Sequence, residues 1–117
     1  ATWGCDGIGT GASSHLIFDG ATNTNTIVSF CGTAGIAAEI CNNLVLNGYN
    51  DWYLPSIDEL ITMDLNLDNA SLGSFSPATY WSSTEITAST AYSNNFASSY
   101  SSSNKTSSFR VRAVRSF

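Results

Sequence analysis

The sequence predicts an α+β fold in which two helices pack on short antiparallel strands, with many loops between them. Apolar residues recur at helical spacing in two stretches, residues 33–44 and 57–65. From residue 80 onward the chain is instead rich in aromatic, Thr and Ser side chains, which favour strands and turns. The 117 residues can build one hydrophobic core, so we predict a single domain over residues 1–117.

The first 32 residues are rich in Gly, Ser, Thr and Asn, a composition that predicts mostly loop. The apolar run at residues 16–18 predicts a short strand, and residues 23–28 predict a single helical turn. The Gly-rich residues 7–11 lack the GxGxxG spacing of a dinucleotide site, and no predicted strand precedes them.

Residues 33–44 predict the first helix, with Thr33 as its N-cap and Asn47-Gly48 ending the region. Its apolar face is expected to comprise Ile36, Ile40, Cys41 and Leu44. A thiol on such a face behaves as a small hydrophobe, so we expect Cys41 to be buried and inert.

The other two cysteines, Cys5 and Cys31, lie in Gly-rich loops and are the better candidates for a disulfide. Such a bridge would close a loop of about 26 residues and stabilise the fold by roughly 3 kcal/mol. The cysteine spacing is not that of a zinc site, and the single histidine, His15, is not placed to help. We therefore expect neither a metal site nor a cofactor.

The second helix is predicted to begin after Ser56. Residues 52–54 form an apolar run with strand propensity, and Pro55 ends this run because it has no N–H to donate. Ser56 and Glu59 have the spacing of a capping box, in which each side chain binds the backbone N–H of the other residue. The helix is expected to bury Leu60, Ile61 and Met63 or Leu65.

Residues 64–69 alternate acidic and amide side chains with leucines, a pattern that partly matches a calcium-binding loop. They lack the Gly at the sixth position of such a loop, and Phe75 stands where its bidentate Glu belongs. We interpret the segment as a helix end followed by a loop.

Residues 82–108 include 11 Ser among 27 residues, and their only charged side chains are Glu85 and Lys105. Disorder is one interpretation of so polar a stretch. However, aromatic residues interrupt it, and the alternating residues 109–115 that close it predict a clear strand. We therefore predict an ordered, β-rich second half, with a strand opening at Tyr80-Trp81.

The charges are distributed unevenly along the chain. All four cations lie within the last thirteen residues, and eight of the nine acids precede residue 70. The C-terminal segment is therefore expected to return to the acidic half, with Arg112 and Arg115 pairing with Asp51, Asp58 or Glu59. Arg110, at the edge of the polar segment, is a better candidate for binding a ligand. A net charge of −5 makes nucleic acid an improbable partner.

The composition favours binding over catalysis. A Ser-His-Asp triad would need His15, and the adjacent Asp58 and Glu59 are better explained as helix capping, so we predict no enzyme. Residues 86–110 have the Ser, Tyr and Asn content of antibody paratopes, although a functionally silent surface is the alternative. The sparse Lys and Glu are typical of secreted proteins. We find no signal peptide and no membrane-spanning run, so export would depend on segments outside these residues.

Several motifs together resemble one family, the Lcl C-terminal domain family, named for a bacterial collagen-like adhesin. The resemblance covers nearly the whole chain. The motifs are Trp3-Gly4-Cys5, Ala37-Ala38 with Cys41, Asn47-Gly48-Tyr49, Asp51 to Ser56, Glu59-Leu60, Tyr80 to Glu85, and Val111 to Arg115.

This resemblance implies a C-type-lectin-like fold, related to formylglycine-generating-enzyme-like domains. The catalytic cysteines of that enzyme group have no counterpart in the C-terminal half, so the resemblance does not imply their activity. The family's named adhesin binds sulfated polysaccharides, but the acidic balance argues against that ligand here. Members occur as surface adhesins, and some are diversified by retroelements in a C-terminal variable region, which residues 86–110 resemble. The ligand-binding residues so implied, with Arg110, are Ile86, Ser93, Asn95, Ser98, Tyr100, Ser102, Asn104 and Ser108.

We therefore predict a non-catalytic ligand-binding or adhesion domain on a bacterial or phage surface. It would bind a protein or glycan through residues 86–110. The alternative is an assembly module, a homo-oligomer for example, whose Ser-rich face packs against a neighbouring subunit.

Overall fold

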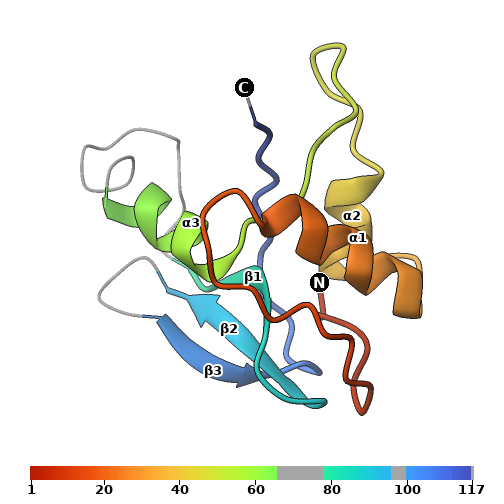
Figure 1. The fold of residues 1–117 in the computed structure, drawn as a ribbon, viewed down its shortest axis with the longest axis vertical. Coiled ribbons are helices and arrows are strands. Elements are labelled where there is room, and N and C mark those ends of the chain that lie inside the picture. The colour runs from red at the N-terminus through yellow and green to blue at the C-terminus, as the bar shows by residue number, and fades with distance from the viewer. Residues whose placement is uncertain (66–77, 96–99, 117) are drawn as a thin grey trace.

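The computed structural model describes residues 1–65, 78–95 and 100–116. Within these ranges the chain forms three helices and a three-stranded antiparallel sheet, which confirms the predicted α+β class. The elements are α1 (Gly20–Cys31), α2 (Ala37–Asn42), α3 (Ile57–Met63), β1 (Tyr80–Glu85), β2 (Thr90–Asn94) and β3 (Tyr100–Asn104) (Figure 1).

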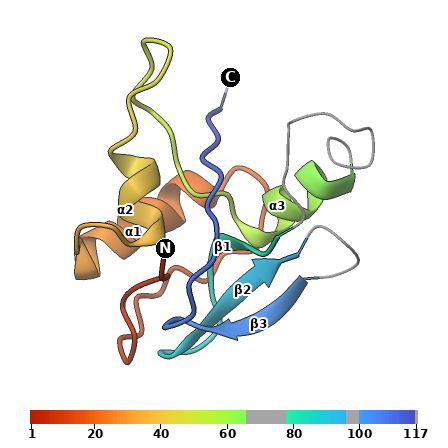
Figure 2. The ribbon, with the colours of Figure 1, turned by 180° about the vertical axis from the view of Figure 1, so that it is seen from behind.

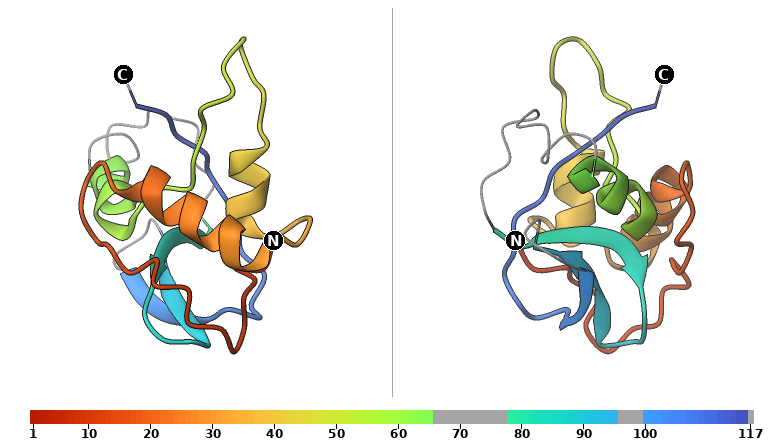
Figure 3. Two further views of the ribbon diagram at one scale, coloured as in Figure 1. Left: turned by 45° about the vertical axis from the view of Figure 1, so that its right-hand side comes forward. Right: turned by 90° about the vertical axis from the view of Figure 1, so that its left-hand side faces the viewer.

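The helices lie on one side of the sheet, as the turned views in Figure 3 show. α1 packs against α2 and β1, and α3 packs against β1 and β2. Seen from behind in Figure 2, the C-terminal segment runs from the sheet toward the loop that protrudes between α2 and α3. The molecule thus has a sheet end and, opposite it, an end formed by this loop and the C-terminal segment.

β1 is the most enclosed strand, and all six of its residues are buried. β2 pairs with one of its edges, and β3 pairs with β2, giving the order β1-β2-β3. Irregular segments cover the other edge of β1, through Ser83 N–H to Pro55 C=O (2.7 Å), Glu85 N–H to Ala12 C=O (2.8 Å) and Trp81 N–H to Arg110 C=O (2.9 Å). β3 is therefore the outer strand of the sheet.

Two tryptophans, Trp3 and Trp81, anchor the core between sheet and helices, and both are fully buried. The indole N–H of Trp3 donates to the Ser82 carbonyl at 2.8 Å, so its polar atom is satisfied inside the core. Around them pack Ile27, Ala37, Ala38, Cys41 and Leu54. The predicted burial of Cys41 is confirmed.

The prediction of two helices was wrong, because α1 was expected to be a single turn at residues 23–28 but has twelve residues. Its buried positions are Gly20, Asn23, Thr24 and Ile27, which have helical spacing. Two of them are polar, so hydrophobic periodicity did not reveal the helix. Asn23 donates to the Ser14 carbonyl at 2.8 Å, and the Thr24 hydroxyl accepts from Leu54 N–H at 3.0 Å.

The helix predicted over residues 33–44 is shorter than expected. α2 has six residues, and its N-cap is Ile36 rather than Thr33. Gly35 adopts φ +90°, a conformation that places a turn between Thr33 and the helix. Ile40 is 40% exposed, so the buried face is narrower than the apolar pattern indicated.

Two predicted strands are absent from the described structure. Residues 16–18 form an exposed turn, in which Phe18 has φ +78° and is 78% exposed. Residues 109–115 make isolated bridges only, from Arg110 to Tyr80 and from Val114 to Tyr53. Tyr53, the partner of Val114, belongs to the apolar run at residues 52–54, for which the sequence predicts strand propensity. This run also forms a single isolated bridge and no strand.

The capping box at the start of α3 is confirmed. Glu59 N–H donates to the Ser56 hydroxyl at 3.3 Å, and Ser56 N–H donates to the Glu59 carboxylate at 2.9 Å. The same carboxylate accepts from Gly20 N–H at 3.1 Å and from the Tyr53 hydroxyl at 3.0 Å. Glu59 therefore joins the starts of α1 and α3. Of the residues predicted to be buried in this helix, Leu60 is buried, Ile61 and Met63 are half-buried, and Leu65, beyond the end of α3, is 62% exposed.

The predicted disulfide between Cys5 and Cys31 is confirmed, with a Cα–Cα distance of 5.7 Å. It ties the N-terminal loop to the end of α1.

Candidate functional site

β3 presents a row of hydroxyl, amide and phenol groups at the outer edge of the sheet. Tyr100 is 54% exposed, and Ser101, Ser102 and Asn104 are also exposed. The strand pairs with β2 without a bulge, in a register that runs from Thr90 opposite Asn104 to Asn94 opposite Tyr100. The Tyr, Ser and Asn side chains are therefore held on a regular backbone.

Three aromatic rings form a band beside this row. The Tyr92 ring lies between those of His15 and Tyr100, with centroid distances of 5.1 Å and 5.8 Å, and both contacts are edge-to-face. The Tyr92–Tyr100 contact is the diagonal cross-strand pairing that the register allows. An aromatic band next to hydroxyl and amide groups can contact both the apolar and the polar parts of a ligand.

The structure brings together only part of the predicted binding set. Tyr100, Ser102 and Asn104 share β3, and Ile86, 38% exposed, lies in the β1–β2 turn near the Asn104 end. Asn95 is half-buried at the opposite end of β2. Ser98 lies outside the described residues.

Ser93 does not reach the surface. It is fully buried, and its hydroxyl pairs with the Ser103 hydroxyl at 2.9 Å. Side chains alternate between the two faces of a strand, and Ser93 lies on the face directed into the protein. It therefore holds β2 to β3 and is removed from the expected ligand contacts.

Arg110 and Ser108 also lie apart from the β3 row. Arg110 is exposed, but its backbone pairs with β1 on the side away from β2. Three strand spacings therefore separate it from β3, roughly 14 Å. The Ser108 hydroxyl lies 3.4 Å from the Ala1 amino nitrogen.

A buried ion pair joins Glu85, the last residue of β1, to Lys105, the residue that follows β3. It fixes this end of the sheet. The Lys105 ammonium lies 2.6 Å from the Glu85 carboxylate, and Lys105 is fully buried. The ammonium also donates to the carbonyls of Cys5 (3.4 Å) and Ile8 (3.1 Å), and lies 4.5 Å from the Trp3 ring centroid. Both charges are thus compensated inside the protein.

The N-terminal loop completes this network. The Glu85 carboxylate accepts from the backbone N–H groups of Thr10 (3.0 Å) and Gly11 (3.2 Å). Burial by itself would raise the pKa of Glu85, but the hydrogen bonds from Lys105 and these two N–H groups lower it below the ordinary value. Residues 5–11, β1 and the end of β3 therefore form one unit.

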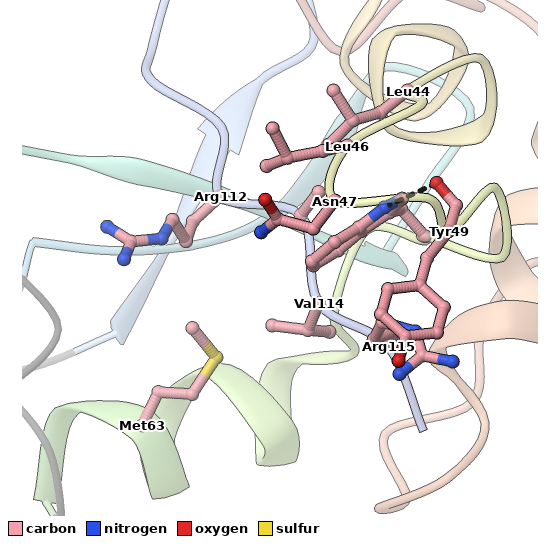
Figure 4. A pocket seen from close by; sticks show the side chains of 10 residues that line it. Leu44, Leu46, Asn47, Tyr49, Met63, Arg112, Val114 and Arg115 are labelled. Carbon is pink, nitrogen blue, oxygen red and sulfur yellow. Dashed lines mark hydrogen bonds between the residues drawn. The ribbon is translucent and has the colours of Figure 1, made fainter. Parts of the chain in front are cut away.

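A second candidate site is an apolar cleft of about 550 Å³ at the opposite end of the molecule (Figure 4). Its walls come from the loop after α2, from Met63 of α3 and from the C-terminal segment. The loop is a tight hairpin in which Leu46 and Tyr49 exchange two backbone bonds of 3.0 Å. Asn47 and Gly48 occupy its tip with φ +55° and +81°, the conformation typical of an Asn-Gly type I′ turn.

One side of the cleft is held by the ion pair between Asp51 and Arg115, one of the pairings predicted from the sequence. Arg115 donates two hydrogen bonds to the Asp51 carboxylate, at 2.7 Å and 3.0 Å. Its guanidinium carbon lies 3.6 Å from the centroid of the Tyr49 ring, the face-on contact visible in Figure 4. Arg112 lines the opposite side of the cleft, with its guanidinium directed away from Tyr49.

A smaller hollow of about 290 Å³ adjoins the cleft, and the two share Met63, Val114 and Arg115. Large apolar side chains around both hollows are exposed, namely Ile17, Phe18, Val45, Leu46 and Tyr49. This end of the molecule is therefore hydrophobic, whereas the β3 edge is polar.

Sequence reasoning missed two features of these sites. The Asn47-Gly48 hairpin had a signal, because Asn-Gly between apolar residues predicts a two-residue turn. The sequence also contained a signal for the pairing of Lys105 with Glu85, because these are the only charged residues among residues 82–108.

The described residues assemble no cluster of three or more His, Cys, Asp and Glu side chains that could hold a metal ion. Of the segment considered for calcium, residues 66–69 lie outside the described part of the chain. Burial raises the pKa of the Cys41 thiol to about 12, which makes it a poor nucleophile at neutral pH. None of the helices that the structure describes is long and apolar enough to cross a bilayer.

The comparison with family models decides the relationship that the motifs suggested. The model of the Lcl C-terminal domain matches residues 11–115. The chain belongs to the Lcl C-terminal domain family. This membership, with an internal disulfide, gives the chain the character of an adhesin-like domain and is compatible with an extracellular location. Comparisons with curated proteins and with solved structures give no match.

Proposed function

We propose that this Lcl C-terminal domain is a non-catalytic adhesion domain that binds a protein or glycan through β3 and the adjoining aromatic band. The observation that supports this most is the row of exposed Tyr100, Ser102 and Asn104 on a regular strand. Such side chains give large contact area and adaptable hydrogen bonds, and here the backbone that carries them is already fixed by its pairing with β2. Binding therefore requires little further loss of backbone conformational entropy.

The proposal extends to the setting of the domain. We propose a C-type-lectin-like arrangement, in which a short sheet backed by helices displays a polar C-terminal region. In this arrangement residues 86–110 would be the region diversified by a retroelement, and the domain would be displayed on a bacterial or virion surface. Sequencing the encoding locus for a reverse transcriptase and a template repeat tests the diversification.

A direct test uses binding to a glycan array and to an array of immobilised bacterial surface proteins. We expect Tyr100→Ala to weaken binding by about tenfold or more, since exposed Tyr residues often dominate interfaces. Val45→Ser, on the distant apolar hairpin, is the matched control and should leave binding unchanged. Equal loss in both variants, or binding that Tyr100→Ala does not alter, would refute the assignment to β3.

The apolar end favours a second function, contact with a neighbouring subunit in an assembly. Exposed apolar side chains around the cleft form the kind of surface that marks interaction sites. The sequence had suggested the Ser-rich face for this role, but the cleft is the better candidate. Mass measurement by light scattering tests it: Leu46→Ser should dissociate such an assembly, and Ser102→Ala should not.

A further inference from the structure

We propose that the free edge of β3 binds an extended, uncharged peptide segment of a partner protein, which adds to the sheet as a fourth strand. This inference rests on the proposed function and deepens it, because it assigns a partner class and a binding mode to the same face. The recognising groups are those of the backbone, and the exposed side chains then select among sequences.

The direction of the β3 backbone groups follows from the ladder. Lys105 N–H donates to the Ser89 carbonyl at 2.9 Å, so residues 89 and 105 are a hydrogen-bonded pair. The register continues without a shift to Asn94 opposite Tyr100. Hydrogen-bonded and non-hydrogen-bonded pairs alternate along an antiparallel ladder. Tyr100, Ser102 and Asn104 therefore direct their backbone N–H and C=O groups away from β2.

Most of these outward groups have no protein partner in the described structure. Among residues 100–104, one outward group is used, the Asn104 carbonyl, which accepts from Ser107 N–H at 2.9 Å. The N–H and C=O of Tyr100 and Ser102, and the N–H of Asn104, remain for a ligand. An extended peptide carries donors and acceptors with the same repeat, so it can satisfy all five groups at once.

The edge also lacks the usual protection against strand addition. Natural edge strands are commonly protected by a charged side chain, a proline or a bulge. Residues 86–104 contain neither a charged residue nor a proline, and the β2–β3 register has no bulge. The irregularity in the sheet lies between β1 and β2, on the enclosed side. Among the described residues, therefore, no charge, proline or bulge on β3 opposes an incoming strand.

The side chains beside the edge indicate the chemistry of the partner. One face of the incoming strand would meet Tyr100 and the aromatic band behind it, and the other would meet Ser101 and Ser103. We therefore expect aromatic or β-branched residues alternating with small hydroxyl residues. Lys105, the one cation close to the strand, is buried against Glu85, so an acidic peptide would gain nothing.

The experiment separates backbone recognition from side-chain recognition at one position. The probe is a displayed library of uncharged decapeptides in which Tyr, Val or Ile alternates with Ser or Thr. Ser102→Pro removes the outward N–H and keeps the inward ladder bonds, a placement that edge strands tolerate. Ser102→Ala removes only the hydroxyl. We expect Ser102→Pro to weaken the best peptide at least tenfold, and to weaken it clearly more than Ser102→Ala does.

N-methylation of the peptide gives a second readout that needs no variant protein. A peptide paired as a strand directs alternate amides to β3, so N-methyl groups should abolish binding at every second position only. The amides of Tyr100, Ser102 and Asn104 should also gain protection from hydrogen exchange when the peptide binds. These readouts decide the question even if Ser102→Pro does not fold.

Three results would overturn strand addition to a foreign peptide. They are equal effects of the two Ser102 variants, N-methyl sensitivity without a two-residue period, and concentration-dependent self-association through this edge. If the peptide proposal fails while a glycan or folded protein still binds and Tyr100→Ala abolishes that binding, the proposed function stands without it. If Tyr100→Ala has no effect on any ligand, the proposed function fails as well.

Discussion

Two ion pairs among the described residues, Lys105–Glu85 and Arg115–Asp51, differ in how deeply they are buried. Lys105 and Glu85 are enclosed at the sheet end, where two backbone carbonyls, two backbone N–H groups and an indole ring complete their contacts. Asp51 and Arg115 meet at the surface of the hydrophobic end, where Asp51 is 54% exposed. Water replaces a surface partner at little cost, whereas a buried charge that loses its partner has no replacement. The sheet end should therefore depend on its pair far more than the cleft end does.

The largest effect is expected from Lys105→Met, which removes the buried cation and leaves the Glu85 carboxylate inside the protein. We expect a loss of roughly 3–5 kcal/mol in the free energy of unfolding. Urea denaturation followed by tryptophan fluorescence would measure it. The double variant Lys105→Met with Glu85→Gln should recover part of this loss, and a single variant as stable as the parent would contradict the comparison.

Reduction of the disulfide should have the next largest effect. Replacing Cys5 and Cys31 by Ser frees a 26-residue loop in the unfolded chain and should destabilise the domain by roughly 3 kcal/mol. The same network that holds Lys105 contacts the Cys5 carbonyl, so the two losses should not be additive. Thermal melts of the cysteine variant, of Lys105→Met and of the variant that carries all three substitutions measure the coupling. Strict additivity would show that the loop and the ion pair are independent.

The pH dependence of stability should identify Glu85 as the group involved. Its pKa is lowered in the folded protein, so its contribution is complete above its ordinary pKa, near 4.5, and is lost as the pH falls through the folded value. In Lys105→Met the shift of the Glu85 pKa should have the opposite direction, because the lone buried carboxylate is easier to accommodate when protonated. The difference in stability between parent and variant should thus shrink as the pH falls through the ordinary value of 4.5 and further below it. Parallel urea titrations at pH 7 and pH 3 would show it, and a constant difference would exclude Glu85 as the cause.

The smallest effect is expected from Asp51→Asn at the cleft end. The pKa of Asp51 is lowered by its hydrogen bonds from Arg115, but the Asp51 side chain is open to solvent, and dissolved salt screens the pair. We expect a change in melting temperature that is a small fraction of the Lys105→Met effect and that disappears in 1 M NaCl. A loss comparable with that of Lys105→Met would show that the Asp51–Arg115 pair organises the hairpin and the C-terminal segment.

Local chemistry determined several features of this fold in advance. Ser56 and Glu59 specify the start of α3 by themselves, because a capping box needs only residues three positions apart. The pairing of Cys5 with Cys31 was predicted correctly, although Cys31 ends α1 instead of lying in a loop, and the burial of Cys41 was predicted from its place on an apolar face. Tyr100, Ser102 and Asn104 were chosen from composition and family resemblance, and they do lie together and exposed.

The tertiary structure decided the rest. α1 exists because Asn23 and Thr24 find partners in Ser14 and Leu54, so polar side chains occupy positions where a sequence pattern expects apolar ones. Residues 109–115 alternate as a strand does, yet they cover β1 and meet Tyr53 only at single bridges. Ser93 and Ser102 are the same residue type on neighbouring strands, and one is buried while the other is exposed. Burial and hydrogen-bond satisfaction depend on residues distant in sequence, so composition identified the polar region but could not show which of its residues a ligand can reach.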